Sequence, residues 1–278
     1  MESREIFIGH SPDPDDAFMF YALTHGKLDT GGLTFRERVA DIETLNHMGM
    51  EGELEVTALS VHAYGYVMDK YALLPCGGSF GEAVGPIVVA KRPMAVGELA
   101  DLRIAVPGTL TSAYLLLKLL LMNFKFEVAP FDKIMDAVNS GDVEAGLLIH
   151  EGQLTYGQLG LHKIVDLGSW WYEDTRLPVP LGINAVRKDL GQPLMRRILG
   201  LMKASIQWGL THREETVAYA MQFGRGMDEE TTDRFVGMYV NPLTVDMGPR
   251  GHEAIARLLI RGYHAALLPC PSNLDFIQ

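Results

Sequence analysis

The sequence predicts an α/β fold of two lobes with a ligand cleft between them. Short apolar segments alternate with amphipathic helical segments along most of the chain, which is typical of a mostly parallel sheet with helices on its faces. The length of 278 residues exceeds that of an average domain, so two lobes are expected. Segments near residues 90 and 183 are interpreted as crossings between the lobes. We therefore predict a discontinuous large lobe, residues 1–91 and 184–278, and a small inserted lobe, residues 92–183.

Each predicted element rests on local periodicity and on the residues that begin or end it. Residues 33–39 alternate between two faces, as in a strand, whereas residues 87–90 form an apolar run typical of a buried strand. Asp41 can cap the helix that follows it, and Gly52 ends that helix. The strands are expected at residues 6–8, 33–39, 56–59, 87–90, 103–106, 126–129, 147–149, 163–167 and 183–186. The helices are expected at residues 17–24, 42–50, 62–71, 112–123, 133–138, 154–159, 194–211, 214–223, 229–239 and 252–268.

Composition and charge argue against several classes of protein. A hydrophobic content of 47% supports sizeable cores, and a net charge of −11 without any run of Lys or Arg argues against nucleic acid as a partner. The two cysteines, Cys76 and Cys270, have no metal-ligand spacing and suggest no disulfide framework. The N-terminus lacks a secretory pattern, and the longest apolar run, residues 114–122, contains Lys118 and is too short to span a bilayer. We expect a cytoplasmic protein that contacts no membrane, and no heptad pattern indicates an oligomeric state.

An acid-rich loop, residues 10–16, follows the first predicted strand and precedes a helix. Asp15 or Asp16 would cap that helix. The loop lies where substrates bind in α/β sheets, so Ser11, Asp15 and Asp16 are candidate substrate contacts. Asp13, Asp15 and Asp16 could instead supply oxygen ligands to a metal ion. Capping and turn chemistry explain Asp and Pro here without a metal, so no metal is predicted.

Hydroxyl side chains end two further predicted strands. Ser60 follows one strand, where it can bind a ligand or cap the next helix. Thr111 and Ser112 lie at the N-terminus of an apolar helix, where free N–H groups and the positive end of the helix dipole favour a carboxylate or phosphate. A plain Ser/Thr cap is the alternative. These three residues are candidate substrate contacts.

His150 follows the apolar run of residues 147–149, at the expected carboxyl end of a strand, and Glu151 comes directly after it. The ordinary pKa of an imidazole lies near neutrality, so a histidine in a cleft can act as a general base. A hydrogen-bonded histidine in the wall of the cleft is the structural alternative. We predict that His150 is catalytic and that Glu151 contacts the substrate.

Other segments carry weaker functional signals. The glycine-rich residues 77–86 match neither a Walker A loop nor a dinucleotide fingerprint. The aromatic cluster of residues 169–172 could stack on a flat ligand or belong to the core. The last ninety residues are mostly helical, and no chemistry is predicted there.

The candidate residues at 10–16, 60, 107–112 and 150–151 all follow predicted strands. They are therefore expected to converge on one cleft between the lobes, a favoured place for a small ligand. This is the plan of a two-lobed, periplasmic-binding-protein-like (type II) solute-binding protein.

The chain also resembles a known family, the 1,4-dihydroxy-6-naphthoate synthases of the futalosine route to menaquinone. The resemblance covers nearly the whole chain. It rests on Ser11-Pro-x-Pro14 with Asp16, Phe18-x-Phe-Tyr-Ala-Leu23, Glu43-Thr-Leu-Asn46, Gly85-Pro86, Val106-Pro-Gly108, Thr111 with Ala113-Tyr114, Gly146-Leu-x-Ile-His-Glu151, Val165-Asp-Leu-Gly168, Trp171, Leu177-Pro-x-Pro-Leu-Gly182, Arg187-x-Asp-Leu190 and Tyr239-Val-Asn241.

The resemblance implies a cofactor-free carbon–carbon lyase acting on a small-molecule carboxylate. Such an enzyme converts cyclic dehypoxanthine futalosine to 1,4-dihydroxy-6-naphthoate and releases dihydroxyacetone. The general base of the family matches His150 here. Its polar cleft contacts match Ser60, Thr111, Ser112 and the loop from Ser11 to Asp16.

One loop departs from the family pattern. The family usually has Ser-Pro-Cys-Pro-Asn-Asp-Thr where this chain has Ser11-Pro-Asp-Pro-Asp-Asp-Ala17. Asp15 in place of Asn removes an amide donor and can add a charge, and Ala17 in place of Thr removes a hydroxyl. A diverged branch with the same reaction and one with a related substrate both remain open. The alternative from another class is a non-catalytic cytoplasmic binding protein or sensor on the same two-lobed plan.

Overall fold

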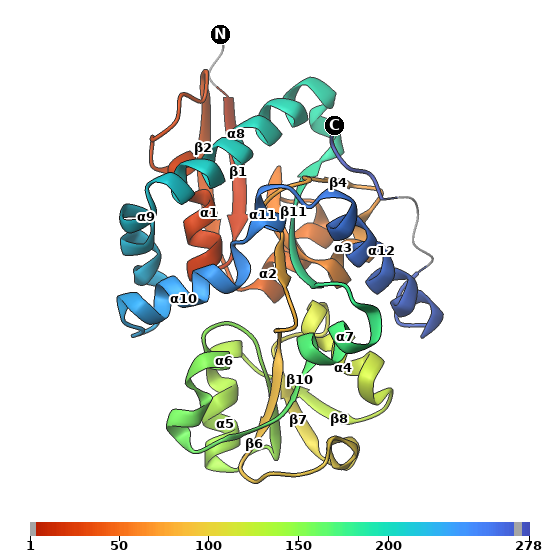
Figure 1. The fold of residues 1–278 in the computed structure, drawn as a ribbon. Helices are drawn as coiled ribbons and strands as arrows, with labels where there is room; N and C mark the ends of the chain where they lie inside the picture. Colours follow the sequence, from red (N-terminus) through yellow and green to blue (C-terminus); the bar gives the residue numbers. More distant parts are fainter. Residues whose placement is uncertain (1–3, 270–273) are drawn as a thin grey trace.

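The computed structural model, which describes residues 4–269 and 274–278, has two lobes, each built on its own mixed sheet (Figure 1). The first sheet has the order β2-β1-β3-β11-β4, with β5 paired to β11. Its strands are β1 (Arg4–His10), β2 (Leu33–Val39), β3 (Val56–Ser60), β4 (Tyr71–Leu73), β5 (Ser79–Gly81) and β11 (Val179–Arg187). The second sheet has the order β10-β6-β9-β7-β8. Its strands are β6 (Ile87–Ala90), β7 (Arg103–Val106), β8 (Lys125–Val128), β9 (Ala145–Leu148) and β10 (His162–Asp166).

Helices cover the faces of both sheets (Figure 1). Around the first sheet lie α1 (Pro14–Thr24), α2 (Ile42–Glu51), α3 (Val61–Val67), α8 (Gln192–Thr211), α9 (Arg213–Ala220), α10 (Glu229–Tyr239), α11 (Pro242–Val245) and α12 (Gly248–His264), with the short 3-10 turns η4 (Lys188–Leu190) and η5 (Met221–Phe223). Around the second lie α4 (Ser112–Leu121), α5 (Ile134–Ser140), α6 (Gly152–Thr155) and α7 (Leu167–Thr175), with η1 (Val96–Asp101), η2 (Phe131–Lys133) and η3 (Tyr156–Leu159). The prediction of two α/β lobes is confirmed.

The prediction of a mostly parallel sheet is wrong, because two strands run against their neighbours. β1 is parallel to β2 and β3, and β7 is parallel to β8 and β9. β6 is antiparallel to β9 and β10, and β11 is antiparallel to β3, β4 and β5. β6 and β11 carry the chain between lobes, so each enters its sheet from the edge at which the parallel strands end. The carboxyl ends of the parallel strands of both sheets therefore face the gap between the lobes.

The lobe boundaries, residues 1–91 with 184–278 and residues 92–183, remain a prediction. The segment 87–90 pairs within the second sheet, and the segment 179–187 pairs within the first. A helix was also expected to continue to Tyr71, but α3 ends at Val67 and Tyr71 begins β4. That strand and β5 were not anticipated, because each has three residues and too little periodicity to detect.

The apolar core joins the two lobes on one side. One cluster of buried side chains includes Leu59 and Tyr64 beside the first sheet together with Leu116 and Trp171 beside the second. Leu59 lies on β3, whereas Tyr64, Leu116 and Trp171 lie on α3, α4 and α7, which run with α12 along one side of the molecule (Figure 1). Trp171 is fully buried and donates from Nε1 to Pro178 O. The aromatic cluster predicted at residues 169–172 therefore contributes its central ring to the core.

Helix α1 places the acidic loop at the gap. The helix begins at Pro14, not at residue 17, because proline is favoured in the first turn and acids there complement the helix dipole. Asp13 occupies the N-cap position without a side-chain cap bond, and Asp15 and Asp16 lie inside the first turn. The prediction that Asp15 or Asp16 caps this helix is therefore wrong. Residues 14–23 are all buried, which anchors the loop firmly.

Two further observations concern the chain as a whole. No helix in residues 4–269 or 274–278 is long and apolar enough to cross a membrane. Cys76 is buried with a free thiol, and Cys270 lies outside the described residues.

Candidate active site

The predicted loops meet at one cavity between the lobes. Its volume is about 110 Å³, which suits an organic ligand better than a single water. Seven of the eight predicted site residues line it: Ser11, Asp15, Asp16, Ser60, Thr111, Ser112 and His150. The eighth, Glu151, does not line it. Local strand-end patterns thus identified a set of residues that the fold brings together.

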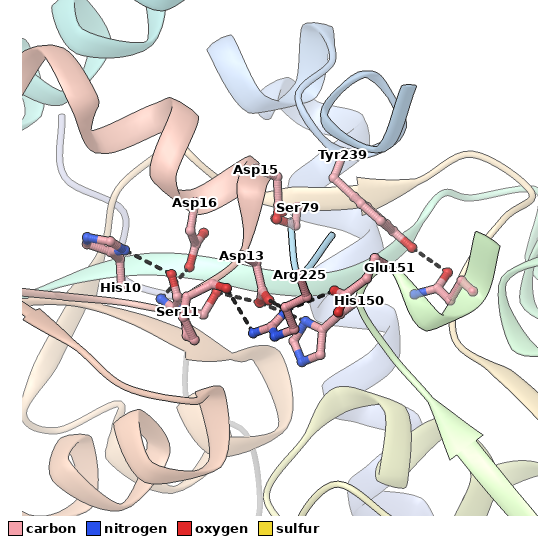
Figure 2. A network of polar contacts seen from close by, with 12 residues as sticks. His10, Ser11, Asp13, Asp15, Asp16, Ser79, His150, Glu151, Arg225 and Tyr239 are labelled. Atoms are coloured by element: carbon pink, nitrogen blue, oxygen red, sulfur yellow. Dashed lines mark hydrogen bonds and ion pairs between the residues drawn. The ribbon is translucent and has the colours of Figure 1, made fainter. Parts of the chain in front are cut away.

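Hydrogen bonds within the acidic loop separate its carboxyl groups (Figure 2). Ser11 donates from its backbone N to Asp16 Oδ2 at 2.8 Å and from Oγ to Asp13 Oδ2 at 2.6 Å. Asp15 Oδ2 instead accepts from Ser79 Oγ at 3.1 Å, across the cavity wall. Each of the three acids therefore has a different set of donors.

Burial and the neighbouring charges together determine the protonation of each acid. Burial would raise the pKa of Asp13, but His150, Ser11 and Arg225 together outweigh it, so the pKa is lowered. Burial, followed by the neighbouring carboxylates of Asp16 and Asp13, raises the pKa of Asp15 well above its ordinary value. Burial also raises the pKa of Asp16, although His10 and the backbone N–H of Ser11 oppose this. The loop thus combines an anion at position 13 with a carboxyl at position 15 that favours its proton.

A metal ion would require the carboxylates of Asp13, Asp15 and Asp16 to converge on one point. Each of them is instead hydrogen-bonded to a different donor. Among the residues that the structure describes, no group of three His, Cys, Asp or Glu side chains is arranged to hold a metal ion.

His150 lies beyond the end of β9 in a left-handed backbone conformation, with φ of +63°. Such a conformation costs a non-glycine residue about 1–3 kcal/mol and persists where surrounding contacts enforce it. Its Nδ1 lies 2.7 Å from Asp13 Oδ2, and the Phe131 ring packs edge-on with ring centres 4.2 Å apart. The other ring nitrogen, Nε2, is buried and has no hydrogen-bond partner among the described residues. That nitrogen is available to a ligand in the cavity.

Arg225 was missed by the sequence reasoning, which assigned no chemistry to the last ninety residues. Its Nη1 lies 2.8 Å from Glu151 Oε2 and 3.4 Å from Asp13 Oδ1, and its guanidinium stacks over the Phe131 ring at 4.4 Å. Glu151 thus pairs with a cation from the other lobe (Figure 2). Nothing local in the sequence marks Arg225, because its partners lie 74 or more positions away.

The hydroxyl residues surround the N-termini of α3 and α4. Ser60 Oγ accepts from Asn46 Nδ2 at 3.0 Å, so its own proton remains available to a ligand. Thr111 caps α4 by accepting from Tyr114 N at 3.1 Å, which confirms the capping alternative for that side chain. Ser112 Oγ donates to Leu181 O at 2.6 Å. The first N–H groups of α4 have no partner inside the helix, so this end of the cavity suits an anion.

Three more polar side chains in the cavity wall were not predicted. Tyr239 OH donates to Gln153 Oε1 at 2.7 Å, which joins α10 of one lobe to α6 of the other. Asn184 donates from Nδ2 to Gly77 O at 2.8 Å, while its buried Oδ1 has no partner among the described residues. Tyr239 does belong to a motif that carries the family resemblance, which was the available signal for it.

Two mixed α/β lobes that enclose a cavity at the carboxyl ends of their parallel strands define the periplasmic-binding-protein-like fold of type II. The alkanesulfonate-binding protein SsuA from Xanthomonas axonopodis pv. citri, solved with MOPS bound, shares this fold with a TM-score of 0.74 at 13% identity, over 97% of this chain and 96% of that one. A crystal structure of a protein from Archaeoglobus fulgidus is more similar, with a TM-score of 0.91 at 45% identity over 95% of this chain and 98% of that one.

The chain belongs to the menaquinone biosynthesis family, whose model matches residues 6–264. It is 42% identical to the 1,4-dihydroxy-6-naphtoate synthase of Thermus thermophilus, over 90% of this chain and 91% of that protein. It is 38% identical to the 1,4-dihydroxy-6-naphtoate synthase of Streptomyces coelicolor, over 99% of this chain and 100% of that protein. The family resemblance noted in the sequence is confirmed.

Proposed function

We propose that the chain is a cofactor-independent carbon–carbon lyase that converts cyclic dehypoxanthine futalosine to 1,4-dihydroxy-6-naphthoate and dihydroxyacetone. Family membership and two relatives named as synthases support the product. The observation that carries the proposal is the position of His150. It lines the same cavity as Ser60 and the N-terminus of α4, and its Nε2 has no partner among the described residues.

His150 is the proposed general base. Its Nε2 takes a proton from the bound substrate, the bond to the three-carbon fragment breaks, and the remaining rings become aromatic. A base in a cavity that excludes water is effective because the surrounding charges and dipoles act on the reaction at low dielectric.

The substrate carboxylate is proposed to bind at the N-terminus of α4, at Thr111 and Ser112. The helix dipole and the unpaired N–H groups of the first turn favour an anion there. Ser60 can donate its hydroxyl proton, and Asn184 Oδ1 can accept from a substrate hydroxyl. Glu151 is proposed to act through Arg225, because its carboxylate is bonded to that guanidinium.

The test is turnover of the purified protein on cyclic dehypoxanthine futalosine, with the naphthoate product quantified by liquid chromatography. The His150→Ala variant is expected to lose about 10²–10⁴-fold in kcat, the usual contribution of a general base. Its dissociation constant for the substrate is expected to change little. His264→Ala, at an exposed position at the end of α12, is the matched control and is expected to keep the activity.

The same assay separates the enzyme from a binding protein or sensor. Tight binding without any naphthoate product, together with no effect of His150→Ala, would favour the binding protein and contradict the proposed reaction.

A further inference from the structure

The carboxylate of Asp13, from the first lobe, contacts the imidazole of His150, from the second. Asp13 follows β1, whereas His150 follows β9, and their side chains meet at 2.7 Å between Oδ2 and Nδ1 (Figure 2). Both side chains are largely buried, with exposed fractions of 6% and 9%. A contact of this kind determines which nitrogen of an imidazole carries the proton, because a carboxylate can only accept.

We propose that Asp13 is a positioning residue that holds His150 with its proton on Nδ1, so that Nε2 is the basic nitrogen offered to the substrate. The inference deepens the proposed function and rests on it, since it assumes that His150 is the base.

The surroundings of Asp13 keep its carboxylate charged and oriented. Ser11 Oγ donates to the same Oδ2 at 2.6 Å, and Arg225 Nη1 lies 3.4 Å from Oδ1. Burial would raise the pKa of Asp13, but His150, Ser11 and Arg225 together lower it. With both oxygens engaged, the carboxylate has little freedom to turn away from His150.

The surroundings of His150 fix the ring against that carboxylate. Its backbone is held in the left-handed conformation, and the Phe131 ring packs on the side of the imidazole at 4.2 Å. Arg225 in turn stacks on Phe131 at 4.4 Å, so the same guanidinium supports both partners. Because the partners come from different lobes, this arrangement requires the lobes to be closed.

The first measurement is the ¹⁵N NMR spectrum of the histidine side chains of the full chain at high pH, where imidazoles are neutral. His150→Gln identifies the His150 signals. The wild-type protein is expected to carry the His150 proton on Nδ1. In Asp13→Asn and Asp13→Ala, the proton is expected to shift toward Nε2, the nitrogen that is usually protonated in an unconstrained histidine.

The second measurement is turnover by the same variants. Loss of the constraint is expected to lower kcat by about 100-fold or more while KM changes much less, as when the acid of a His–Asp pair is replaced in other enzymes. Glu37→Gln is the matched control, since Glu37 Oε1 lies 3.5 Å from Nε2 of another buried histidine, His10, outside the cavity. It is expected to leave kcat and the His150 signals unchanged.

The outcomes separate this inference from the proposed function. A wild-type protein that makes no naphthoate but shows the Nδ1 proton and its loss in the Asp13 variants would refute the reaction and keep the pairing. An unchanged His150 tautomer in Asp13→Asn and Asp13→Ala would overturn the inference, as would an unchanged kcat in a protein that is active. An equal loss of kcat in Glu37→Gln would also overturn it, because the effect would then not be specific to Asp13.

Discussion

At the scale of single residues, burial and neighbouring charges give the three acids of the loop different protonation states. Asp13 has His150 and Arg225 beside it and is stabilised as an anion. Asp15 is buried, the carboxyl groups of Asp16 and Asp13 stand near it, and its hydrogen-bond donor is the neutral hydroxyl of Ser79. Because the pKa of Asp15 is raised, the folded protein holds a proton that the unfolded chain releases near its ordinary pKa of about 4. The stability of the protein is therefore expected to fall as the pH rises above that value, until the folded pKa is reached.

Asp15→Asn removes this loss of stability, because an amide does not titrate. An amide has nearly the shape of a protonated carboxyl, still accepts from Ser79, and still offers a donor to a ligand. We expect the variant to be more stable than wild type at neutral pH, by about 1.4 kcal/mol for each unit of raised pKa, with no gain below about pH 4. Urea unfolding at several pH values measures the difference. Asp101→Asn, at an exposed position, is the control. A gain for Asp15→Asn that does not depend on pH would contradict the assignment.

At the scale of elements, the loop between β7 and α4 contacts the first turn of α2 across the lobes. Both carboxylate oxygens of Glu43 lie 3.1 Å from Leu110 N, and a Cβ on Gly108 would lie 2.2 Å from the Glu43 carboxyl carbon. Gly108→Ala therefore forces Glu43 away from Leu110, and it also strains the loop backbone, where φ is +157°. A hydrogen bond to a charged group contributes about 1.5–3 kcal/mol, so we expect KM to rise about tenfold or more as closure weakens.

Gly97→Ala is the matched control, because a Cβ there meets no heavy atom within 4 Å. Steady-state kinetics and thermal unfolding of both variants provide the measurement. An unchanged KM in Gly108→Ala would show that this contact plays no part in closing the cavity.

Elements whose signal is local were predicted well. Ser60, Thr111 and His150 each follow a strand pattern in the sequence, and the general rule for α/β sheets places such residues at one edge. The start of α1 was placed three residues late, because Pro14 and the following acids suit a turn as well as a first helical turn. The direction of β11 could not be predicted from its own residues, because it depends on where the chain returns from the other lobe. Arg225 was missed for the same reason, since its role comes entirely from distant partners.

At the scale of the whole molecule, polar contacts cross between the lobes beside a continuous apolar core. The core lies along α3, α4, α7 and α12, whereas α10 and α6 meet on the other side (Figure 1). The polar contacts are Asp13 with His150, Arg225 with Glu151, Tyr239 with Gln153, and Glu43 with Leu110. Apolar packing tolerates small rotations better than directional hydrogen bonds do, so we expect the lobes to open by turning about the core and breaking these contacts. In the proposed reaction, closure would bring His150 and Asp13 together and remove water in one step.

The ion pair of Arg225 with Glu151 tests this arrangement through a double-mutant cycle. If the pair helps to close the cavity, Arg225→Ala and Glu151→Ala should each raise KM, and the double variant should raise it by less than the product of the two effects. A coupling free energy of about 0.5–3 kcal/mol is expected for residues in direct contact.

Arg250 and Glu82 provide the matched pair, because their two hydrogen bonds of 2.9 and 2.6 Å join α12 to the turn after β5 beside one sheet. That pair is exposed and crosses no lobe boundary, so its cycle should leave KM unchanged. Independent effects of Arg225→Ala and Glu151→Ala would show that the pair does not control closure. A coupling of equal size in the Arg250 and Glu82 cycle would show instead that KM responds to surface charge in general.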